Sequence, residues 1–386
     1  MTSASHAAIL IQRVQQRTSA LEIVYKSHDR WPLRPVRSNC RPRRPIRISV
    51  LDSSFNPPTL AHLALAKSRP VHPFPSSPPP TASSSSHRDG NVVDRGDSER
   101  EEREERRSEG NVIVNCDGSS LLVSDSEAYM GLNDYDARLL LLSVRNADKS
   151  LASTDASYVQ RIEMMIRLAR KLESELLSTT ASTSSTNDDE VDDSSTRPSG
   201  GTTNTANVAV AIIDEPTFVR KSSVLLAALQ ERIQSLLSSS TPAAHPAPTP
   251  QLTFLVGLDT LERMFAPRYY PSPDAMLASL SKFLGSPPSG EGSRVVCARR
   301  VMSEWIVPGA EDDVSLDKYM RLREDAVVHA AHIFVDDGSV AFFNLNGEEM
   351  SLSSSGVRKK VKDGTEWRDM VPPNVADCIS QERLYV

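Results

Sequence analysis

Apolar residues occur along this chain in five short, continuous runs, separated by longer and more polar stretches. Each run is rich in Leu, Ile and Val. Continuous apolar runs of this kind are typical of strands that are buried on both faces, as in a parallel sheet. The five predicted strands are Ile46–Leu51, Leu139–Val144, Val208–Ile213, Leu252–Gly257 and Arg294–Arg299.

Helical patterns follow the first three of these runs. They cover Leu60–Ser68, Ala156–Leu177 and Val224–Leu237. In the second of them, apolar side chains recur close to the spacing of an amphipathic helix. The alternation of strands and helices predicts an α/β fold, a doubly wound, Rossmann-like parallel sheet with right-handed crossovers.

Low-complexity stretches interrupt this pattern. They are rich in Ser, Pro and Thr, or in mixed charge as at 94–109, and they lack the apolar surface that would offset the entropy of ordering. The strand pattern resumes after each one, so we expect disordered insertions in a single domain over 45–386, preceded by an N-terminal extension, 1–44, with a helix. The expected flexible insertions are 70–110, 178–206, 236–250 and 284–293.

The charge and the cysteines narrow the class of protein. The net charge of −6 argues against a general nucleic-acid-binding protein, because such proteins are usually strongly basic. The four cysteines form no CxxC pair, which argues against a zinc site or a disulfide scaffold and indicates a reducing compartment, the cytoplasm or the nucleus. No apolar run approaches the ~20 residues that span a bilayer, so no membrane contact is expected.

Residues 30–47 are rich in Arg and Pro, which raises a mitochondrial presequence as an alternative. Glu22 and Asp29 are poor residues for a presequence. A basic surface segment that leads into the first strand is therefore the favoured interpretation.

The stretch Leu51–His62 joins the first predicted strand to the first predicted helix, which begins near Thr59. In doubly wound folds this loop lies at the carboxyl edge of the sheet, where ligands bind. A helix N-terminus there offers free N–H groups to a phosphate, and Thr59 and His62 share one face of its first turn. The alternative is a capped helix start with an incidental histidine.

A second candidate lies near the C-terminus, where three consecutive hydroxyls, Ser353–Ser355, precede Arg358. Serines at a helix start can cap it and also donate to phosphate oxygens. An arginine one turn further on can bind a phosphate through two N–H groups at once. The alternative is a serine-capped basic helix on the surface.

These two stretches resemble motifs of the nucleotidyltransferase superfamily. The first is similar to the GxFxPxHxGH signature, with Ser53 and Ala61 in place of its glycines and Thr59 in place of its first histidine. The second resembles the ISSTxxR motif of the nicotinamide mononucleotide adenylyltransferases, with Ser355 for the threonine.

Four further stretches resemble motifs of this family and follow one another in the family's order. The insertions and Thr59 look most like a divergent fungal branch of the family. The four stretches are 146–165 with Lys149 and Arg161, Asp214–Ser222 with Phe218, Gly257–Leu261 with Asp259, and Val371–Tyr385 with Cys378 for an aromatic residue.

The resemblance implies an enzyme that transfers AMP from ATP to nicotinamide mononucleotide, forming NAD and pyrophosphate by in-line displacement. Mg²⁺ would enter with ATP, held by phosphates and waters, so no protein metal site is expected, and His329 and His332 are interpreted as an exposed pair. The implied catalytic residues are His62, Thr59 and Arg358; the ATP-binding residues add Ser53, Ser54, Phe55, Asn56, Gly257, Asp259, Ser353 and Ser354; the mononucleotide would contact Lys149, Phe218 and Trp305.

Two other functions stay open because of the substitutions at Ser53, Thr59, Ala61 and Cys378. One is a related adenylyl- or cytidylyltransferase with another substrate. The other is a nucleotide-binding protein with weak ATP hydrolysis or none, whose disordered insertions would dock regulatory or quality-control proteins. A class I aminoacyl-tRNA synthetase is disfavoured, since no KMSKS-like lysine loop is visible.

Overall fold

The computed structural model describes residues 4–34, 44–70, 113–114, 120–121, 134–145, 154–181, 206–238, 246–299, 323, 325–345 and 352–386. The chain divides into two units, Met1–Val71 with Tyr135–Val386, and His72–Asp134. In the second unit, β3 (Ile113–Val114) pairs antiparallel with β4 (Ser120–Leu121). Most of the predicted insertions at 70–110 and 178–206 lies outside the described residues. Of the insertion predicted at 236–250, residues 239–245 lie outside as well, whereas 236–238 belong to the helix Phe218–Ser238 and Pro250 begins the strand Pro250–Gly257.

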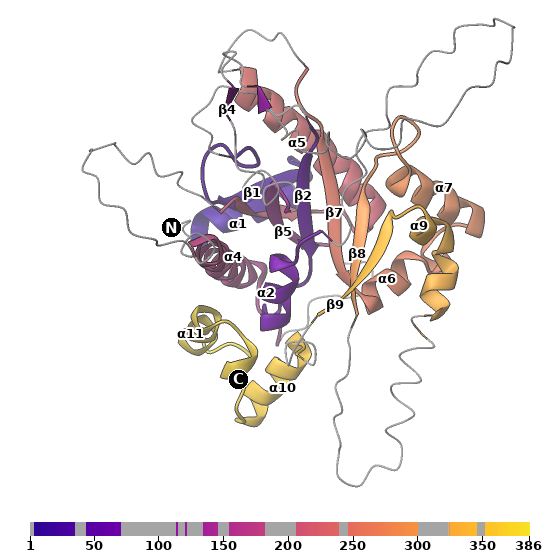
Figure 1. Ribbon diagram of the computed structural model, residues 1–386. Helices are drawn as coiled ribbons and strands as arrows, with labels where there is room; N and C mark the ends of the chain where they lie inside the picture. The colour runs from indigo at the N-terminus through magenta and orange to yellow at the C-terminus, as the bar shows by residue number, and fades with distance from the viewer. Residues whose placement is uncertain are drawn as a thin grey trace, which may run out of the picture. The chain divides into compact units, whose positions relative to one another are not determined.

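The first unit is built on one seven-stranded sheet with the order β1-β6-β5-β2-β7-β8-β9 (Figure 1). Every neighbouring pair is parallel except β1 with β6. All five apolar runs are strands of this sheet, so the predicted doubly wound α/β fold is confirmed. The strands are β1 Leu21–Lys26, β2 Ile46–Asp52, β5 Ala137–Ser143, β6 Val208–Ile213, β7 Pro250–Gly257, β8 Arg294–Arg299 and β9 Val340–Asn344.

The direction in which successive strands are added to the sheet reverses at β2. From β2 the chain moves outward to β5 and β6, and it then returns to place β7 on the other side of β2. In open α/β sheets, ligands bind outside the carboxyl ends of the strands at such a reversal. The loop that follows β2 lies at this point, because Asp52 ends the strand.

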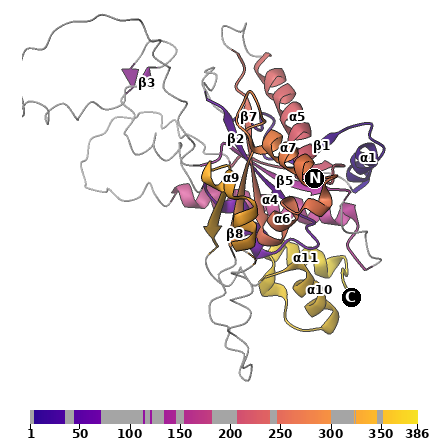
Figure 2. The ribbon, with the colours of Figure 1, turned by 90° about the vertical axis from the view of Figure 1, so that its right-hand side faces the viewer.

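Helices cover both faces of the sheet (Figures 1 and 2). On one face α4 contacts β6 and β5, α2 contacts β2, and α1 contacts α4. On the other, α5 and α7 pack in one apolar core with Ile48, Val50 and Phe254 of the sheet. The helices are α1 Ala4–Gln15, α2 Leu60–Lys67, α4 Tyr158–Ala181, α5 Phe218–Ser238, α6 Leu258–Met264, α7 Pro273–Leu284, α9 His332–Asp336, α10 Ser354–Asp363 and α11 Pro373–Gln381, with 3₁₀ turns at Pro267–Tyr269 and Arg368–Met370.

The last two helices form a small layer of their own beside the start of α4. Val357 of α10 and Val375 and Ile379 of α11 share an apolar cluster with Met164 of α4. In both ribbon views, α10 and α11 lie next to each other, apart from the layers that cover the sheet (Figures 1 and 2). This packing brings the second predicted motif, at the start of α10, to the region where α2 and α4 begin.

Several segments differ from what the sequence suggested. The expected N-terminal extension contributes α1 and β1, and β1 completes the sheet as an edge strand beside β6. The expected insertion at 284–293 is a turn held by hydrogen bonds, including 2.8 Å from the Gly292 N–H to the Gly285 carbonyl. The Glu291 carboxylate of this turn accepts from the hydroxyls of Ser222 and Ser223.

No helix among the described residues combines the length and the apolar character that a membrane crossing requires.

Candidate nucleotide site

The first turn of α2 fixes the ring of His62. The Thr59 N–H donates to His62 Nδ1 at 3.0 Å, and the Thr59 hydroxyl lies 2.9 Å from the same nitrogen. A backbone N–H can only donate, so Nδ1 is the acceptor and the neutral ring carries its proton on Nε2. Nε2 lies 2.9 Å from Ser53 Oγ and donates to it. The histidine therefore presents an N–H toward the loop that follows β2.

The loop itself is held in a tight conformation. Phe55 is fully buried with a φ of 45°, a left-handed backbone conformation that is unfavourable for a large side chain. Its ring centroid lies 5.3 Å from that of His62. Conformations of this kind persist only where packing imposes them, and they are concentrated at functional sites.

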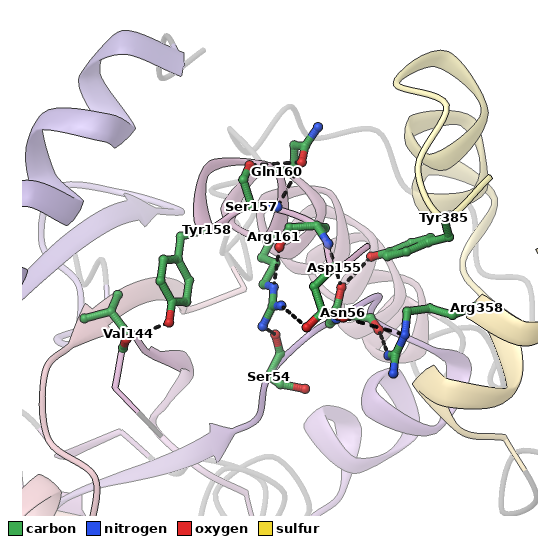
Figure 3. Close-up of polar contacts among 11 residues, drawn as sticks. Ser54, Asn56, Val144, Asp155, Ser157, Tyr158, Gln160, Arg161, Arg358 and Tyr385 are labelled. Atoms are coloured by element: carbon green, nitrogen blue, oxygen red, sulfur yellow. Dashed lines mark hydrogen bonds and ion pairs between the residues drawn. The ribbon is translucent and has the colours of Figure 1, made fainter. Parts of the chain in front are cut away.

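The start of α10 is hydrogen-bonded to this same loop. Ser353 caps the helix, since its Oγ accepts from the Gly356 N–H at 3.0 Å. The Ser354 hydroxyl donates to the Pro57 carbonyl at 2.7 Å, and Arg358 Nη1 donates to the Asn56 carbonyl at 2.5 Å. The two motifs that the sequence singled out, about three hundred residues apart, therefore meet in one place (Figure 3).

Asn56 is the centre of a buried polar network in this loop (Figure 3). Its Nδ2 donates to Asp155 Oδ1 at 2.6 Å. Its Oδ1 accepts from the Tyr385 hydroxyl at 2.8 Å and from the Ala156 N–H at 3.2 Å. Burial raises the pKa of Tyr385, which keeps the phenol neutral and able to donate.

Two arginines lie on either side of Asp155. Arg161 is buried; its Nε donates to the Ala156 carbonyl at 2.8 Å, and its Nη2 lies 3.4 Å from Asp155 Oδ2. Burial lowers the pKa of Arg161, and Asp155 opposes that shift. Arg358 Nε lies 3.8 Å from Asp155 Oδ1. Two guanidinium groups thus share one carboxylate, and this trio carries a net positive charge that suits a phosphate.

A buried ion pair lies at the end of β2, immediately before the loop. Lys221 Nζ is 2.5 Å from Asp52 Oδ2, and the two side chains are only 6% and 8% exposed. The ammonium group also lies 4.9 Å from the ring centroid of Phe218. This pair was not predicted from the sequence, although Lys221 lies between Phe218 and Leu225 at a spacing that places it on the buried stripe of a helix.

Replacing Lys221 by methionine is expected to lower the free energy of unfolding by about 3–5 kcal/mol, because Asp52 is left as an uncompensated buried charge. Urea denaturation measures the loss. Lys67→Met is the matched control: Lys67 pairs with Glu175 at 2.6 Å but is 43% exposed, so its loss should cost at most about 1 kcal/mol. Equal effects of the two substitutions would contradict the assignment of a buried pair.

The other predicted site residues make no hydrogen bond or ion pair with the loop after β2 that the structure shows among the described residues. Phe218 is half-buried and packs edge-on against Phe254 of the core, with 5.5 Å between ring centroids. Gly257 ends β7, the strand beside β2, and nothing lies within 4 Å of a Cβ built on it. Asp259 is largely exposed and is bound by Arg323 Nη2 at 2.9 Å. Lys149 and Trp305 lie outside the described residues.

The two remaining histidines of interest show no metal-binding arrangement in the described part of the chain. His329 and His332 stack with 6.1 Å between ring centroids. No group of three metal-binding side chains occurs among the described residues.

A cavity of about 600 Å³ runs along α2, between that helix and the end of β9. It is lined by Leu60, Leu63, Ala64 and Lys67 of α2, and by Phe343, Asn344 and Leu345 on the other side. Neither His62 nor Arg358 lines it, and its cationic side chains are Lys67 and Arg69.

Comparisons with known proteins gave structural matches only. No family model and no curated protein matches the chain. One solved structure that matches is Plasmodium falciparum nicotinic acid mononucleotide adenylyltransferase complexed with NaAD, at 11% identity and a TM-score of 0.37, covering 88% of this chain and 97% of that one. The same enzyme complexed with APC matches at 9% identity and a TM-score of 0.36, covering 88% and 96%. The strand order and parallel register described above establish the α/β fold independently of these matches.

Proposed function

We propose that this chain is a nucleotidyltransferase that holds ATP between the starts of α2 and α10 and transfers AMP to nicotinamide mononucleotide, forming NAD and pyrophosphate. One observation carries the proposal. The hydrogen bonds from Arg358 to the Asn56 carbonyl and from Ser354 to the Pro57 carbonyl join two motifs that each suit a phosphate. Both motifs lie at the loop after β2, where doubly wound sheets bind their ligands.

The groups in this place suit the chemistry of phosphoryl transfer. A 5′-phosphate oxygen of the mononucleotide attacks the α-phosphorus of ATP, the bond from that phosphorus to the β-bridging oxygen breaks, and pyrophosphate leaves with the electron pair. No protein nucleophile is needed, so catalysis consists of positioning and charge stabilisation. Mg²⁺, bound through the phosphates of ATP, would neutralise part of their charge.

Roles follow from the donors that each residue presents. A phosphate oxygen that replaces Ser53 Oγ as acceptor receives the Nε2–H of His62, which stabilises the charge that develops at the α-phosphate. Thr59 holds the ring through Nδ1. Arg358, Ser353 and Ser354 would hold the β- and γ-phosphates at the positive end of α10. Gly257 and Asp259 would lie toward the adenosine, and nucleotide binding there would require Asp259 to leave Arg323.

A single assay tests the proposal. Purified protein is incubated with ATP, Mg²⁺ and nicotinamide mononucleotide, and NAD and pyrophosphate are quantified. We expect equal amounts of the two products. ATP binding without NAD formation would contradict the proposal and favour a nucleotide-binding protein; activity with a different nucleotide acceptor would favour a related transferase.

A further inference from the structure

The carboxylate of Asp155 holds both the loop after β2 and the arginine of α10. It accepts from Asn56 Nδ2 at 2.6 Å and lies 3.8 Å from Arg358 Nε. It also lies 3.4 Å from Arg161 Nη2. Figure 3 shows Asp155 between the two arginines, with Asn56 beside it. No motif in the sequence singled this residue out.

Asp155 acts on Arg358 directly, through its charge near Nε, and also indirectly, through Asn56. The Asn56 amide has one orientation that satisfies all of its neighbours: Nδ2 faces the carboxylate, and Oδ1 faces the Tyr385 hydroxyl and the Ala156 N–H. These bonds anchor the side chain of Asn56, and the backbone carbonyl of the same residue accepts from Arg358 Nη1 at 2.5 Å. Asp155 therefore orients the residue that holds the guanidinium group.

One nitrogen of that guanidinium group, Nη2, makes no polar contact with the described residues. Among the described residues, Arg358 makes polar contacts through Nε and Nη1, and its side chain is 33% exposed. Nη2 can bind a phosphate oxygen while Nη1 stays bound to the Asn56 carbonyl. At 3.8 Å from Nε, Asp155 is close enough to offset part of the arginine's charge without binding Nη2.

We propose that Asp155 is the positioning residue of the phosphate site: it orients Arg358 through Asn56, and its charge limits how tightly the site holds pyrophosphate, so that the product can leave. This inference rests on the proposed function. An arginine pair without the carboxylate would bind a polyanion more strongly but would retain the product. The carboxylate thus lowers the affinity for pyrophosphate and thereby allows faster turnover.

The test is Asp155→Asn, which keeps an oxygen that accepts from Asn56 and removes the charge. Binding of inorganic pyrophosphate and of ATP is measured by titration calorimetry, and turnover by NAD formation. We expect pyrophosphate to bind about tenfold more tightly while kcat falls. Asp155→Glu should restore the natural affinity. Asp363→Asn removes the same charge from the exposed end of α10 and should change neither quantity.

Each outcome decides something different. Absence of pyrophosphate and ATP binding by the natural chain would overturn the proposed function and this inference together. Normal binding and turnover by the natural chain, with unchanged or weaker pyrophosphate binding in a folded Asp155→Asn, would overturn this inference alone. If Asp155→Asn fails to fold, Tyr385→Phe tests the orienting route: kcat should fall with no gain in pyrophosphate affinity, in a protein that still unfolds in one cooperative thermal transition. An unchanged kcat in that variant would overturn the route.

Discussion

Replacing His62 by alanine is expected to lower kcat for AMP transfer by about 10²–10³. The imidazole carries its proton on Nε2 because the Thr59 N–H occupies Nδ1, and this N–H is the donor available to the α-phosphate. Its contribution arises as charge develops in the transition state, so KM for ATP should change much less than kcat. Steady-state kinetics of NAD formation measure both quantities.

The matched control for this change is His332→Ala, which removes an exposed histidine of α9. It should leave kcat and KM within a factor of two, by the expectation for surface substitutions. A His62→Ala protein that keeps its full kcat would show that the histidine is incidental to a capped helix start, which is the alternative that the sequence left open.

Replacing Arg358 by alanine is expected to lower kcat/KM for ATP by about 10²–10³, because the β- and γ-phosphates lose their fixed guanidinium partner. Arg358→Lys should recover only part of this loss. A lysine supplies a point charge, but it cannot donate to the Asn56 carbonyl and to a phosphate in the fixed geometry of the guanidinium group. The kinetics of NAD formation at varied ATP concentration give the comparison.

Lys359 provides the control for this second prediction, since it is the next residue on α10 and is exposed. Lys359→Ala should change kcat/KM less than twofold. Full activity in Arg358→Lys would contradict the geometric role and would reduce the contribution of Arg358 to its charge alone.

The central part of the fold could be read from the sequence because of how a parallel sheet is buried. Strands covered on both faces are apolar at most positions, so β2, β5, β6, β7 and β8 stand out as nearly continuous runs. The edge strands β1 and β9 were not predicted. Several of their positions are only partly buried, which allows polar residues such as Glu22 and Asn344 and removes the signal.

The candidate site could be predicted only where its residues are close in sequence. Thr59 and His62 share one helical turn, and Ser353 to Arg358 lie within the first two turns of α10, so spacing alone brings each set together. The partners that connect these sets are distant in sequence: Asp155 lies 99 residues from Asn56, and Tyr385 lies 329 residues from it. A single aspartate before a helix has no periodic or local pattern, so only the folded structure identifies it.

Phe218 illustrates a different limit of sequence analysis. An aromatic residue at the start of a helix fits a ring-stacking role and a core role equally well. In the structure its ring packs edge-on against Phe254, and the Lys221 ammonium group lies over it. Its contact with the mononucleotide stays a prediction.

The most direct test of the account is a crystal structure of the chain with an ATP analogue whose α,β bridge resists cleavage. The central claim is that the starts of α2 and α10 bind one triphosphate. The account predicts phosphate oxygens within hydrogen-bonding distance of His62 Nε2 and of the Arg358 guanidinium group in the same complex. A triphosphate bound elsewhere, for example in the cavity along α2, or one that contacts only one of these two residues, would contradict it.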